Sequence, residues 1–594
     1  MDVPEELMRK AHELRSTLPA GQRPPDTDAL LRWFTEEHHG QTHRSLEVYQ
    51  SAEAGLSFRV AQTGNATITA GEPVVVCPLS ASLSYLNAIG GGQPLGKLQE
   101  PGTDPSLAFP RAFTQKVPPH VIGRFFLMQQ FRQGTASPWA PYISTLPQPQ
   151  DYDSWALPAV WPDEGGDAAA LALLEGTNAE VAAAEMRQRI ESEFRAAWPL
   201  LGDDKHKNTY TFALYEWAYC IFTSRSFRPS LVLTPEIQAA LARGTDDAVD
   251  ARHLAMINHA SMPQGCGIDD FSLLLPVLDI GNHDPRAVVQ WTPVVDASRT
   301  ALSSAAVLTP APSTSAEHAI VFLTGGATHN SGQPVFNNYG SKTNSELLVG
   351  YGFVLAPTRD MHNDYVHLRK RGELDAYNAA AAGTSANAVH RDFLLSLRPM
   401  DAPSSPVGLA RLPQTQHVDG VTTPDSTRQR SPGFALADDG LLWDMLSLML
   451  QPENRDQVQR YAVVKITGKP EYLTASMAEV HAAVPTPEQL RDTILDLVFR
   501  THPSGLETPA LLRSISMQVR LALLYKFDAD LEKLQAKDAA LASFAPSSPH
   551  ERLALQYRTQ YATVLSNAID VLGREAEDDD DDEEESDDEE EEDK

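Results

Sequence analysis

Strand-like sequence occurs in two parts of this chain, and a long helical stretch separates them. Residues 55–79 alternate in polarity and are rich in β-branched residues, and strand-like and mixed patterns return at residues 271–291 and 320–368. Residues 118–225 instead follow a mostly helical pattern, and helices dominate again from residue 374 onward. The sequence therefore predicts an α+β chain in which strands at both ends flank a helical insertion and a helical domain follows. At 594 residues we expect two to four domains.

The clearest helix of the sequence lies directly before a run of acidic residues. Its apolar face consists of Tyr557, Tyr561, Val564, Leu565, Ala568, Ile569 and Leu572. Residues 575–593 then contain 17 Asp or Glu, and Lys594 adds one positive charge, so this segment carries −16 of the formal net charge of −31. The rest of the chain carries the remaining −15. A segment with so few apolar side chains cannot bury enough surface to fold, so we expect a disordered acidic tail.

Charge and cysteine content narrow the expected partners and compartment. Phosphate binding depends on clustered Lys and Arg, so we expect no nucleic acid, and a basic protein is a better partner for this acidic chain. No apolar run approaches the roughly 18 residues that a membrane span needs, and MDVPEELMRKAHELR at the start lacks a signal-peptide core. Cys77, Cys220 and Cys266 lie far apart without a CxxC or Cys/His cluster, so we expect neither disulfides nor a bound metal. These features predict a cytoplasmic or nuclear protein without membrane contact, and we expect a monomer.

Four short motifs occur in order along the chain. Residues 137–147 read SPWAPYISTLP, residues 223–227 read TSRSF, residues 273–283 read LLLPVLDIGNH and residues 339–353 read YGSKTNSELLVGYGF. Together they resemble the motifs of the SET-domain methyltransferases of the RuBisCO large-subunit methyltransferase type, which include the fungal ribosomal-protein lysine methyltransferases. Each motif alone is weak, but four in the right order make chance an improbable explanation.

The resemblance implies a SET-domain β-fold split by a helical insertion and followed by an all-α substrate-binding domain, after which the disordered acidic tail expected from composition ends the layout. It covers residues 28–370 well and residues 374–574 more loosely. The expected segments are an N-terminal segment at 1–27, the N-terminal part of the SET domain at 28–117, the helical SET insertion at 118–270, the C-terminal part of the SET domain at 271–370, the helical substrate-binding domain at 371–574 and the tail at 575–594.

The activity that the resemblance implies is methyl transfer from S-adenosylmethionine to a protein lysine, with a ribosomal or other basic protein as substrate. Free lysine has a pKa of about 10.4, so only about one part in 2,500 is neutral at neutral pH. A dry aromatic channel lowers that pKa, and aromatic faces tolerate the positive sulfonium of the cofactor. Alignment of nitrogen, methyl carbon and sulfur supplies much of the remaining acceleration.

The last motif contains two Tyr-Gly pairs on either side of a short helical run. By resemblance, Tyr351 stands at the position of the catalytic tyrosine, whose hydroxyl orients the amine and the transferring methyl. Tyr339 would line the cofactor or lysine pocket, and Phe227 and Phe353 would line the substrate side. We therefore interpret the pairs as two aromatic walls of one site, with Gly340 and Gly352 leaving room for a ligand. The alternative is that Tyr351 simply packs on Phe353 in a core.

Cofactor contacts are also expected by resemblance. Asn282 and His283 match an Asn-His element that contacts the cofactor, and Asp279 occupies the acidic position three residues earlier. Arg225 would hold the cofactor's carboxylate, a task suited to a guanidinium.

The segment Gly55, Leu56 and Ser57 is the nearest match to a glycine-rich cofactor segment of the family, with serine in place of a second glycine. A positive φ at Ser57 would strain it.

Two other functions remain open. The first is methylation of histidine by a member of the same family; Tyr351 argues against it, because the histidine-methylating branch differs at this position. The second is a catalytically degenerate SET protein that binds basic clients, for which Ser57 and the acidic tail are the support. Cofactor binding separates this last alternative from the two enzymes.

Overall fold

The computed structural model describes residues 3–14, 26–96, 108–163, 168–202, 207–243, 251–295, 307–309, 318–369, 392–412, 416–418, 421–423, 430–484, 486–500, 509–537, 541 and 544–592. The expected boundary between residues 370 and 371 lies outside these residues, as does Lys594. The division into the six expected segments therefore stays a prediction.

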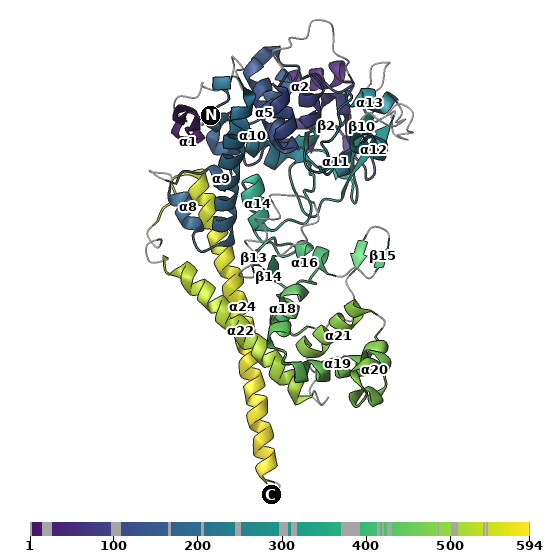
Figure 1. Ribbon diagram of the computed structural model, residues 1–594, viewed down its shortest axis with the longest axis vertical. Coiled ribbons are helices and arrows are strands. Elements are labelled where there is room, and N and C mark those ends of the chain that lie inside the picture. Colours follow the sequence, from purple (N-terminus) through teal and green to yellow (C-terminus); the bar gives the residue numbers. More distant parts are fainter. Residues whose placement is uncertain are drawn as a thin grey trace.

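Three short antiparallel sheets position the segments on which the motifs lie (Figure 1). The largest has the strand order β1-β5-β10-β9, and two three-stranded sheets have the orders β12-β3-β2 and β6-β8-β7. Their strands are β1 (Gln41–Thr42), β2 (Leu46–Ser51), β3 (Gly55–Val60), β5 (Pro73–Pro78), β6 (Leu83–Ser84), β7 (Ser226–Phe227), β8 (Leu273–Leu274), β9 (Val289–Val295), β10 (His318–Thr324) and β12 (Pro334–Val335). Strands β4 (Thr67–Ile68) and β11 (His329–Asn330) form a separate two-stranded antiparallel sheet.

Each of these sheets joins segments that are distant in the sequence. The run of β-branched residues in β5 is buried along its whole length and pairs with β10, with Val76 opposite Val321. Strand β8 pairs with β6 on one side and with β7 on the other. The strand-like segments before and after the helical stretch therefore form common sheets, as the resemblance to a split SET-domain β-fold implies. The short strand β7 lies within the expected helical insertion at residues 118–270 and joins one of these sheets.

Helices surround these sheets in the upper part of Figure 1. They are α1 (Ala11–Leu14), α2 (Thr27–Arg32), α3 (Tyr85–Ile89), α4 (Arg111–Lys116), α5 (Pro119–Gln133), α6 (Ala140–Ile143), α7 (Tyr152–Trp155), α8 (Ala169–Leu174), α9 (Asn178–Ala197), α10 (Phe212–Arg225), α11 (Pro229–Val232), α12 (Pro235–Arg243), α13 (Ala251–Met256) and α14 (Asn344–Tyr351).

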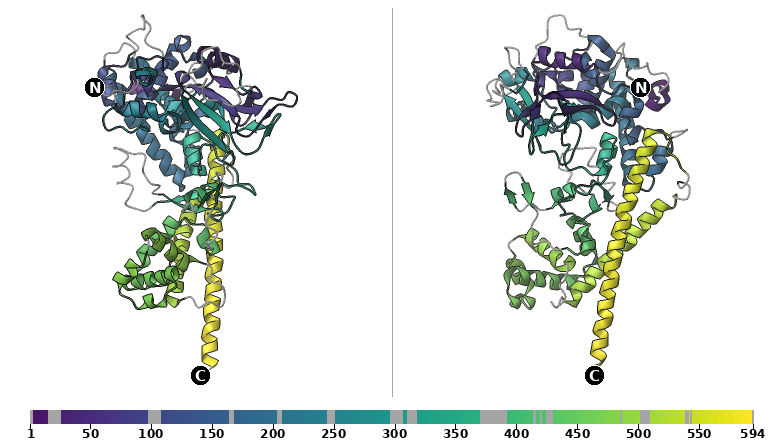
Figure 2. Two further views of the ribbon diagram at one scale, coloured as in Figure 1. Left: turned by 90° about the vertical axis from the view of Figure 1, so that its right-hand side faces the viewer. Right: turned by 180° about the vertical axis from the view of Figure 1, so that it is seen from behind.

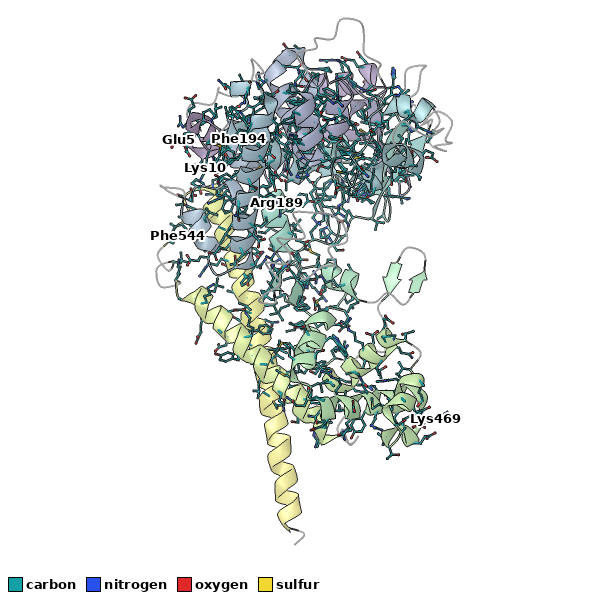
Figure 3. All side chains as sticks on the ribbon, in the orientation of Figure 1. Glu5, Lys10, Arg189, Phe194, Lys469 and Phe544 are labelled. Atoms are coloured by element: carbon teal, nitrogen blue, oxygen red, sulfur yellow. The ribbon has the colours of Figure 1, made fainter. Side chains whose placement is uncertain are left out.

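Aromatic packing holds α5, α9 and α10 together. The ring of Phe125 on α5 lies 5.9 Å from that of Phe194 on α9 and 5.2 Å from that of Tyr215 on α10. Phe194 is labelled in Figure 3. Beside these rings, Glu193 is bonded to Arg124 and accepts a hydrogen bond from the Tyr215 hydroxyl at 2.8 Å. These contacts hold the first turn of α10, whose last residue is Arg225.

The remaining elements form the lower part of Figure 1. They are β13 (Tyr365–Leu368), β14 (Phe393–Ser396), α16 (Pro406–Arg411), β15 (Gln416–Val418), β16 (Val421–Thr423), α17 (Pro432–Ala435), α18 (Asp439–Met449), α19 (Pro452–Thr467), α20 (Met477–Ala482), α21 (Pro487–Phe499), α22 (Ala510–Gln535) and α24 (Pro549–Glu592).

The expectation of an all-α domain at residues 371–574 is wrong in one respect, because three short strands occur there. Strand β14 pairs antiparallel with β13, so that Leu395 lies opposite Val366. Leu394 and Leu395 are both buried, one on each face of this small sheet. A short apolar run of this kind is compatible with a buried strand or a buried helix, and here the edge of β13 provides a partner.

Helix α24 runs along the long axis of the molecule in all views (Figures 1 and 2). Its predicted apolar face is confirmed: six of the seven residues are buried and Ile569 is partly buried. The Arg558 side chain donates to the carbonyl oxygens of Leu173 and Glu175 at 3.2 and 3.0 Å and so ties α24 to the end of α8.

The acidic run differs from its predicted disorder, since α24 continues through it to Glu592. Glu575, the first residue of the expected tail, belongs to the folded part of the chain. Its carboxylate accepts from the backbone N–H of Gly433 at 3.1 Å and forms an ion pair with Arg520 at 3.4 Å. The physical reason is that propagating an existing helix costs far less than nucleating one, and glutamate has a high helix propensity.

Among the described residues, no helix is both long enough and apolar enough to cross a membrane.

Candidate functional site

Tyr351 is the last residue of α14, and the local sequence fixes both ends of this helix. At its start, the Thr343 hydroxyl accepts from the backbone N–H of Glu346 while the Glu346 carboxylate accepts from that of Thr343, which is a capping box. At its end, Gly352 has φ 78° and ψ 25°. This left-handed conformation suits glycine and turns the chain directly after Tyr351.

Gly340 also has a positive φ, of 95°. A Cβ atom there would meet nothing within 4 Å, and one at Gly352 would make only an ordinary contact at 3.5 Å with Leu157. Backbone conformation, rather than crowding by other protein atoms, therefore accounts for both glycines among the described residues.

Four rings form an aromatic cluster consisting of His283, Tyr339, Tyr351 and Phe353. The ring of Tyr339 stacks between those of Tyr351 and His283, with centroid distances of 4.9 Å and 5.0 Å. Phe353 lies 6.4 Å from both Tyr351 and His283, at steep angles. Tyr339, Tyr351 and Phe353 are half-buried, so the cluster combines an apolar base with solvent access. The structure thus brings the two Tyr-Gly pairs together.

The two stacked tyrosines differ in what their hydroxyls do. The Tyr339 hydroxyl donates to the carbonyl oxygen of Gly281 at 3.0 Å. The Tyr351 hydroxyl makes no hydrogen bond within the described part of the chain. Burial raises the pKa of Tyr351, and the nearby Glu346 carboxylate adds to this, so its hydroxyl is protonated at neutral pH. Tyr351 therefore has a neutral hydroxyl available to a ligand, whereas Tyr339 does not.

His283 is buried beneath Tyr339 and is neutral. Burial lowers the pKa of His283 to about 4. Its Nδ1 accepts a hydrogen bond from the backbone N–H of Tyr339 at 3.0 Å, so in the neutral ring the proton lies on Nε2. This Nε2 is buried and has no hydrogen-bond partner among the described residues. A buried donor without a partner is unfavourable unless a ligand or water accepts from it.

Arg225 and Asp279 lie together in the interior beside this cluster. Arg225 Nη1 is 3.7 Å from Asp279 Oδ2, which also accepts from the Tyr142 hydroxyl at 2.9 Å. The side chain of Asp279 is only 2% exposed and that of Arg225 is 27% exposed. Burial raises the pKa of Asp279, and the charge of Arg225 opposes that rise. The carboxylate therefore faces the protein, and the guanidinium is the member of the pair that a ligand can reach.

Val277, two residues before Asp279, has a strained backbone conformation. Val277 has φ 70° and ψ −46°, a conformation that is rare for a β-branched residue. It turns the chain from β8 into the short 3-10 turn η10 (Leu278–Ile280), which contains Asp279. Backbone strain of this kind persists where surrounding structure holds it, often at functional sites.

The segment Gly55, Leu56 and Ser57 lies beside Asn282. The Asn282 side-chain amide donates to the carbonyl oxygen of Leu56 at 3.2 Å and to the Ser57 hydroxyl at 2.6 Å. Ser57 is an ordinary residue of strand β3, and only Gly55 has a positive φ, of 68°. The serine in place of a second glycine is thus accommodated without strain.

Among the described residues, Phe227 makes no ring contact with the aromatic cluster. Its ring packs edge-on against Trp291 of β9, with centroids 5.6 Å apart. Trp291 is half-buried, and its indole N–H lacks a partner among the described residues. Nothing in the sequence singles out Trp291, because a tryptophan in a strand is most simply explained by packing.

Tyr142 was also missed as an individual residue, although it lies in SPWAPYISTLP. Its hydroxyl bond to Asp279 depends on tertiary structure that the motif does not reveal.

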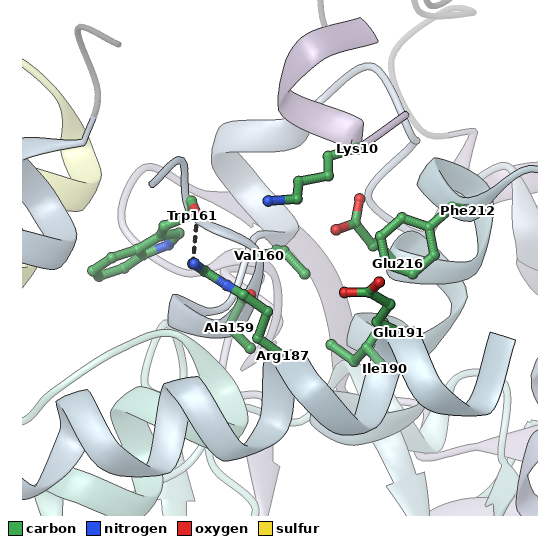
Figure 4. A pocket seen from close by; sticks show the side chains of 9 residues that line it. All are labelled: Lys10, Ala159, Val160, Trp161, Arg187, Ile190, Glu191, Phe212 and Glu216. Carbon is green, nitrogen blue, oxygen red and sulfur yellow. Dashed lines mark hydrogen bonds between the residues drawn. The ribbon is translucent and has the colours of Figure 1, made fainter. Parts of the chain in front are cut away.

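A separate pocket lies between α1, α9 and α10 and shares no residue with the aromatic cluster. Figure 4 shows Lys10, Arg187 and Glu216 around it. Its free space is about 10 Å³, room for about one water molecule, so it cannot hold a cofactor. The Glu216 carboxylate accepts from the backbone N–H of Ala11 at 2.6 Å and thus anchors α1 on α10. This pocket is a packing feature of the N-terminal segment.

Comparison with known proteins gives no matching protein-family model. Ribosomal lysine N-methyltransferase set10 of Schizosaccharomyces pombe is 25% identical over 317 residues, which cover 53% of this chain and 43% of that protein. Ribosomal lysine N-methyltransferase 1 of Saccharomyces cerevisiae is 28% identical over 166 residues, covering 28% of this chain and 19% of that protein. The chain thus spans less than half the length of these curated relatives.

Among solved structures, a similar one is the SET domain of LSMT bound to lysine and AdoHcy, at 13% identity and a TM-score of 0.45 over 93% of this chain and 92% of that chain. The resemblance indicated by the four motifs is confirmed by the curated matches: this chain is similar in sequence to fungal ribosomal lysine N-methyltransferases.

Proposed function

We propose that this protein is an S-adenosylmethionine-dependent protein-lysine N-methyltransferase. The observation that carries the proposal is the pair of stacked tyrosines, of which only Tyr351 leaves its hydroxyl available. The similarity to two proteins named as ribosomal lysine N-methyltransferases supports the same reaction.

The residues around the aromatic cluster fit the cofactor. His283 offers a buried N–H donor that has no partner among the described residues, which suits an acceptor atom of a bound ligand. A guanidinium has five N–H donors, and Arg225 uses only a long contact to Asp279 within the described structure, so it can also bind a carboxylate. Asp279 then acts by holding Arg225 in place. The faces of Tyr339, Tyr351 and Phe353 suit a sulfonium.

When bound, S-adenosylmethionine supplies the methyl group. The protein's own residues do the rest. Loss of water on entering the site disfavours the charged form of an incoming lysine and so lowers its pKa. The Tyr351 hydroxyl, protonated at neutral pH, orients the neutral amine, while the stack on Tyr339 keeps the ring in place. Orientation of the nucleophile is a large part of the rate enhancement available to such a site.

The substrate that fits best is a basic protein, and a ribosomal protein is our first choice. The names of the two curated relatives point to this class. The net charge of −31 favours encounter with a positively charged partner. We propose that this takes place in the cytoplasm or nucleus.

The decisive experiment uses the full-length protein, tritiated S-adenosylmethionine and purified ribosomal proteins, followed by mass spectrometry of the labelled protein. Methylated lysine is the expected product. Label on histidine would instead establish the histidine-methylating alternative. Cofactor binding by calorimetry without transfer to any substrate in a whole-cell lysate would favour the degenerate binding protein.

A further inference from the structure

Helix α24 reaches the helix that carries Tyr351 although the two are far apart in the chain. The Gln560 side chain of α24 faces the start of α14, where its Oε1 accepts from the Asn344 side-chain amide at 3.1 Å across 216 positions of sequence. The Gln560 Nε2 donates to the carbonyl oxygen of Leu355 at 3.0 Å. Both polar atoms of this half-buried side chain therefore form hydrogen bonds, one to a residue before Tyr351 and one to a residue after it.

The two partners of Gln560 are also bonded to each other. The backbone N–H of Leu355 donates to Asn344 Oδ1 at 2.9 Å, and Asn344 Nδ2 donates to the Leu355 carbonyl oxygen at 2.8 Å. These bonds close a ring of chain from residue 344 to residue 355. Tyr351, Gly352 and Phe353 all lie within this closed segment. The Gln560 amide binds to Asn344 and Leu355, the two residues that close this segment.

A second tie holds α14 to α24 one residue further along. The Tyr557 hydroxyl donates to Asn178 Oδ1 at 3.0 Å, and Asn178 Nδ2 donates to the Ser345 hydroxyl at 2.5 Å. Asn344, Ser345 and Tyr557 are buried at 1%, 4% and 2% exposure. Asn344 Nδ2 also donates to Asp364 Oδ1 at 3.0 Å. The polar groups of these residues are therefore satisfied by other protein groups rather than by bulk water, which makes the arrangement sensitive to loss of a partner.

The direction of Tyr351 depends on its ring contacts and on its backbone. Its ring stacks on Tyr339 and meets Phe353, and its hydroxyl has no hydrogen bond within the described part of the chain. The stack on Tyr339 fixes the plane of the ring, and the backbone of the closed segment 344–355, to which Phe353 also belongs, sets where the ring and its hydroxyl lie.

We propose that Gln560 is a positioning residue for Tyr351: by clamping Asn344 to Leu355, helix α24 holds the closed segment 344–355 in the geometry that methyl transfer requires. The catalytic consequence of this inference rests on the proposed function. The clamping of segment 344–355 by Gln560 does not depend on that function. The C-terminal helix thus completes a site whose reacting groups all come from residues before 356.

The test compares full-length Gln560→Ala with Thr559→Ala, a matched control at an exposed neighbouring position of α24. For Gln560→Ala we expect kcat to fall at least tenfold, while the dissociation constant of S-adenosylmethionine and the Tm stay near wild type. We also expect faster amide hydrogen exchange in the peptide that spans residues 344–355. Thr559→Ala should match wild type in every measurement. A merely structural role would lower the Tm and the cofactor affinity together with kcat.

Gln560→Met, which keeps the length of the side chain without its polar atoms, should show the same pattern and replaces Gln560→Ala if that variant does not fold. A kcat within twofold of wild type would overturn the positioning role, as would unchanged hydrogen exchange at residues 344–355. If wild-type protein transfers no methyl group, the proposed function fails on its own, and the exchange measurement still decides whether Gln560 clamps the segment.

Discussion

Tyr339 and Tyr351 stack with ring centroids 4.9 Å apart, but only the hydroxyl of Tyr339 is bonded to the backbone, at Gly281. The two residues therefore share an environment and differ in one available group. Each can serve as the control for the other.

Tyr351→Phe should lower the rate of methyl transfer by roughly 100-fold or more, the usual cost of losing one positioned donor at a reacting centre. The ring and its stack remain, so the cofactor dissociation constant should change little. Tyr339→Phe removes an equivalent hydroxyl that serves the backbone and should leave most of the rate. Single-turnover kinetics with labelled cofactor measure both. Equal rate losses in the two variants would contradict the assignment of Tyr351.

Arg225→Ala should weaken cofactor binding by about 1.5–3 kcal/mol, the range for hydrogen bonds to charged groups. Asp279→Asn should weaken it less, because Asp279 acts only by holding the guanidinium and an asparagine oxygen can still accept from Tyr142. Isothermal titration calorimetry gives both constants. A dissociation constant for Arg225→Ala within twofold of wild type would remove this role.

Asp364→Asn should change how stability depends on pH. Burial raises the pKa of Asp364 to about 6, and the hydrogen bond from Asn344 opposes the rise. Between about pH 4 and pH 6 the folded protein therefore keeps a proton that the unfolded chain releases, so stability falls as pH rises and then levels off. The asparagine variant lacks this loss. The Tm of the variant minus the Tm of wild type should therefore be larger at pH 7 than at pH 4.

Thermal unfolding of the two proteins at pH 4, 5, 6 and 7 checks the Asp364 prediction. Asp401→Asn, at an exposed position, is the control and should run parallel to wild type. If Asp364→Asn also runs parallel to wild type, the carboxyl of Asp364 does not titrate in this range.

Removing residues 577–594 should raise the KM for an intact basic protein several-fold at low salt, because a dense negative charge increases the rate of encounter. The effect should shrink near 0.5 M salt, where charges are screened within a few ångströms. The cut falls after Glu575, since that residue pairs with Arg520 and its loss would disturb the fold.

For this truncation we expect kcat to stay constant and a short neutral peptide substrate to show no change. A full-length variant with asparagine and glutamine in place of the acidic residues should behave like the truncation. Identical low-salt kinetics of truncated and full-length enzyme on the intact protein would reduce the acidic run to a solubility device.

Sequence periodicity and motif order could predict features that depend on short-range pattern. The buried face of α24 and the common sheets on either side of the helical stretch are confirmed for this reason. The resemblance, rather than a local pattern, gave the expectation that Tyr339 and Tyr351 form two walls of one site, and the structure brings their rings together.

Contacts between distant segments could not be predicted in this way. The pairing of Arg225 with Asp279 depends on how α10 and the turn after β8 meet, and the turn needs an unusual φ at Val277 that no local pattern specifies. The strand β14 was missed because a short apolar run is ambiguous until its partner is known. The bond between Gln560 and Asn344 spans 216 positions and involves residue types common on protein surfaces.

The position of α24 in the chain has a consequence for biosynthesis. Its residues leave the ribosome after α8, α9 and α14, against which they pack, and contacts of such long sequence separation form late in folding. A nascent chain that has emerged as far as Phe499 already holds both tyrosines, Arg225 and His283, but not the helix that clamps their neighbours. Competence for the proposed chemistry should therefore arise only near the end of translation.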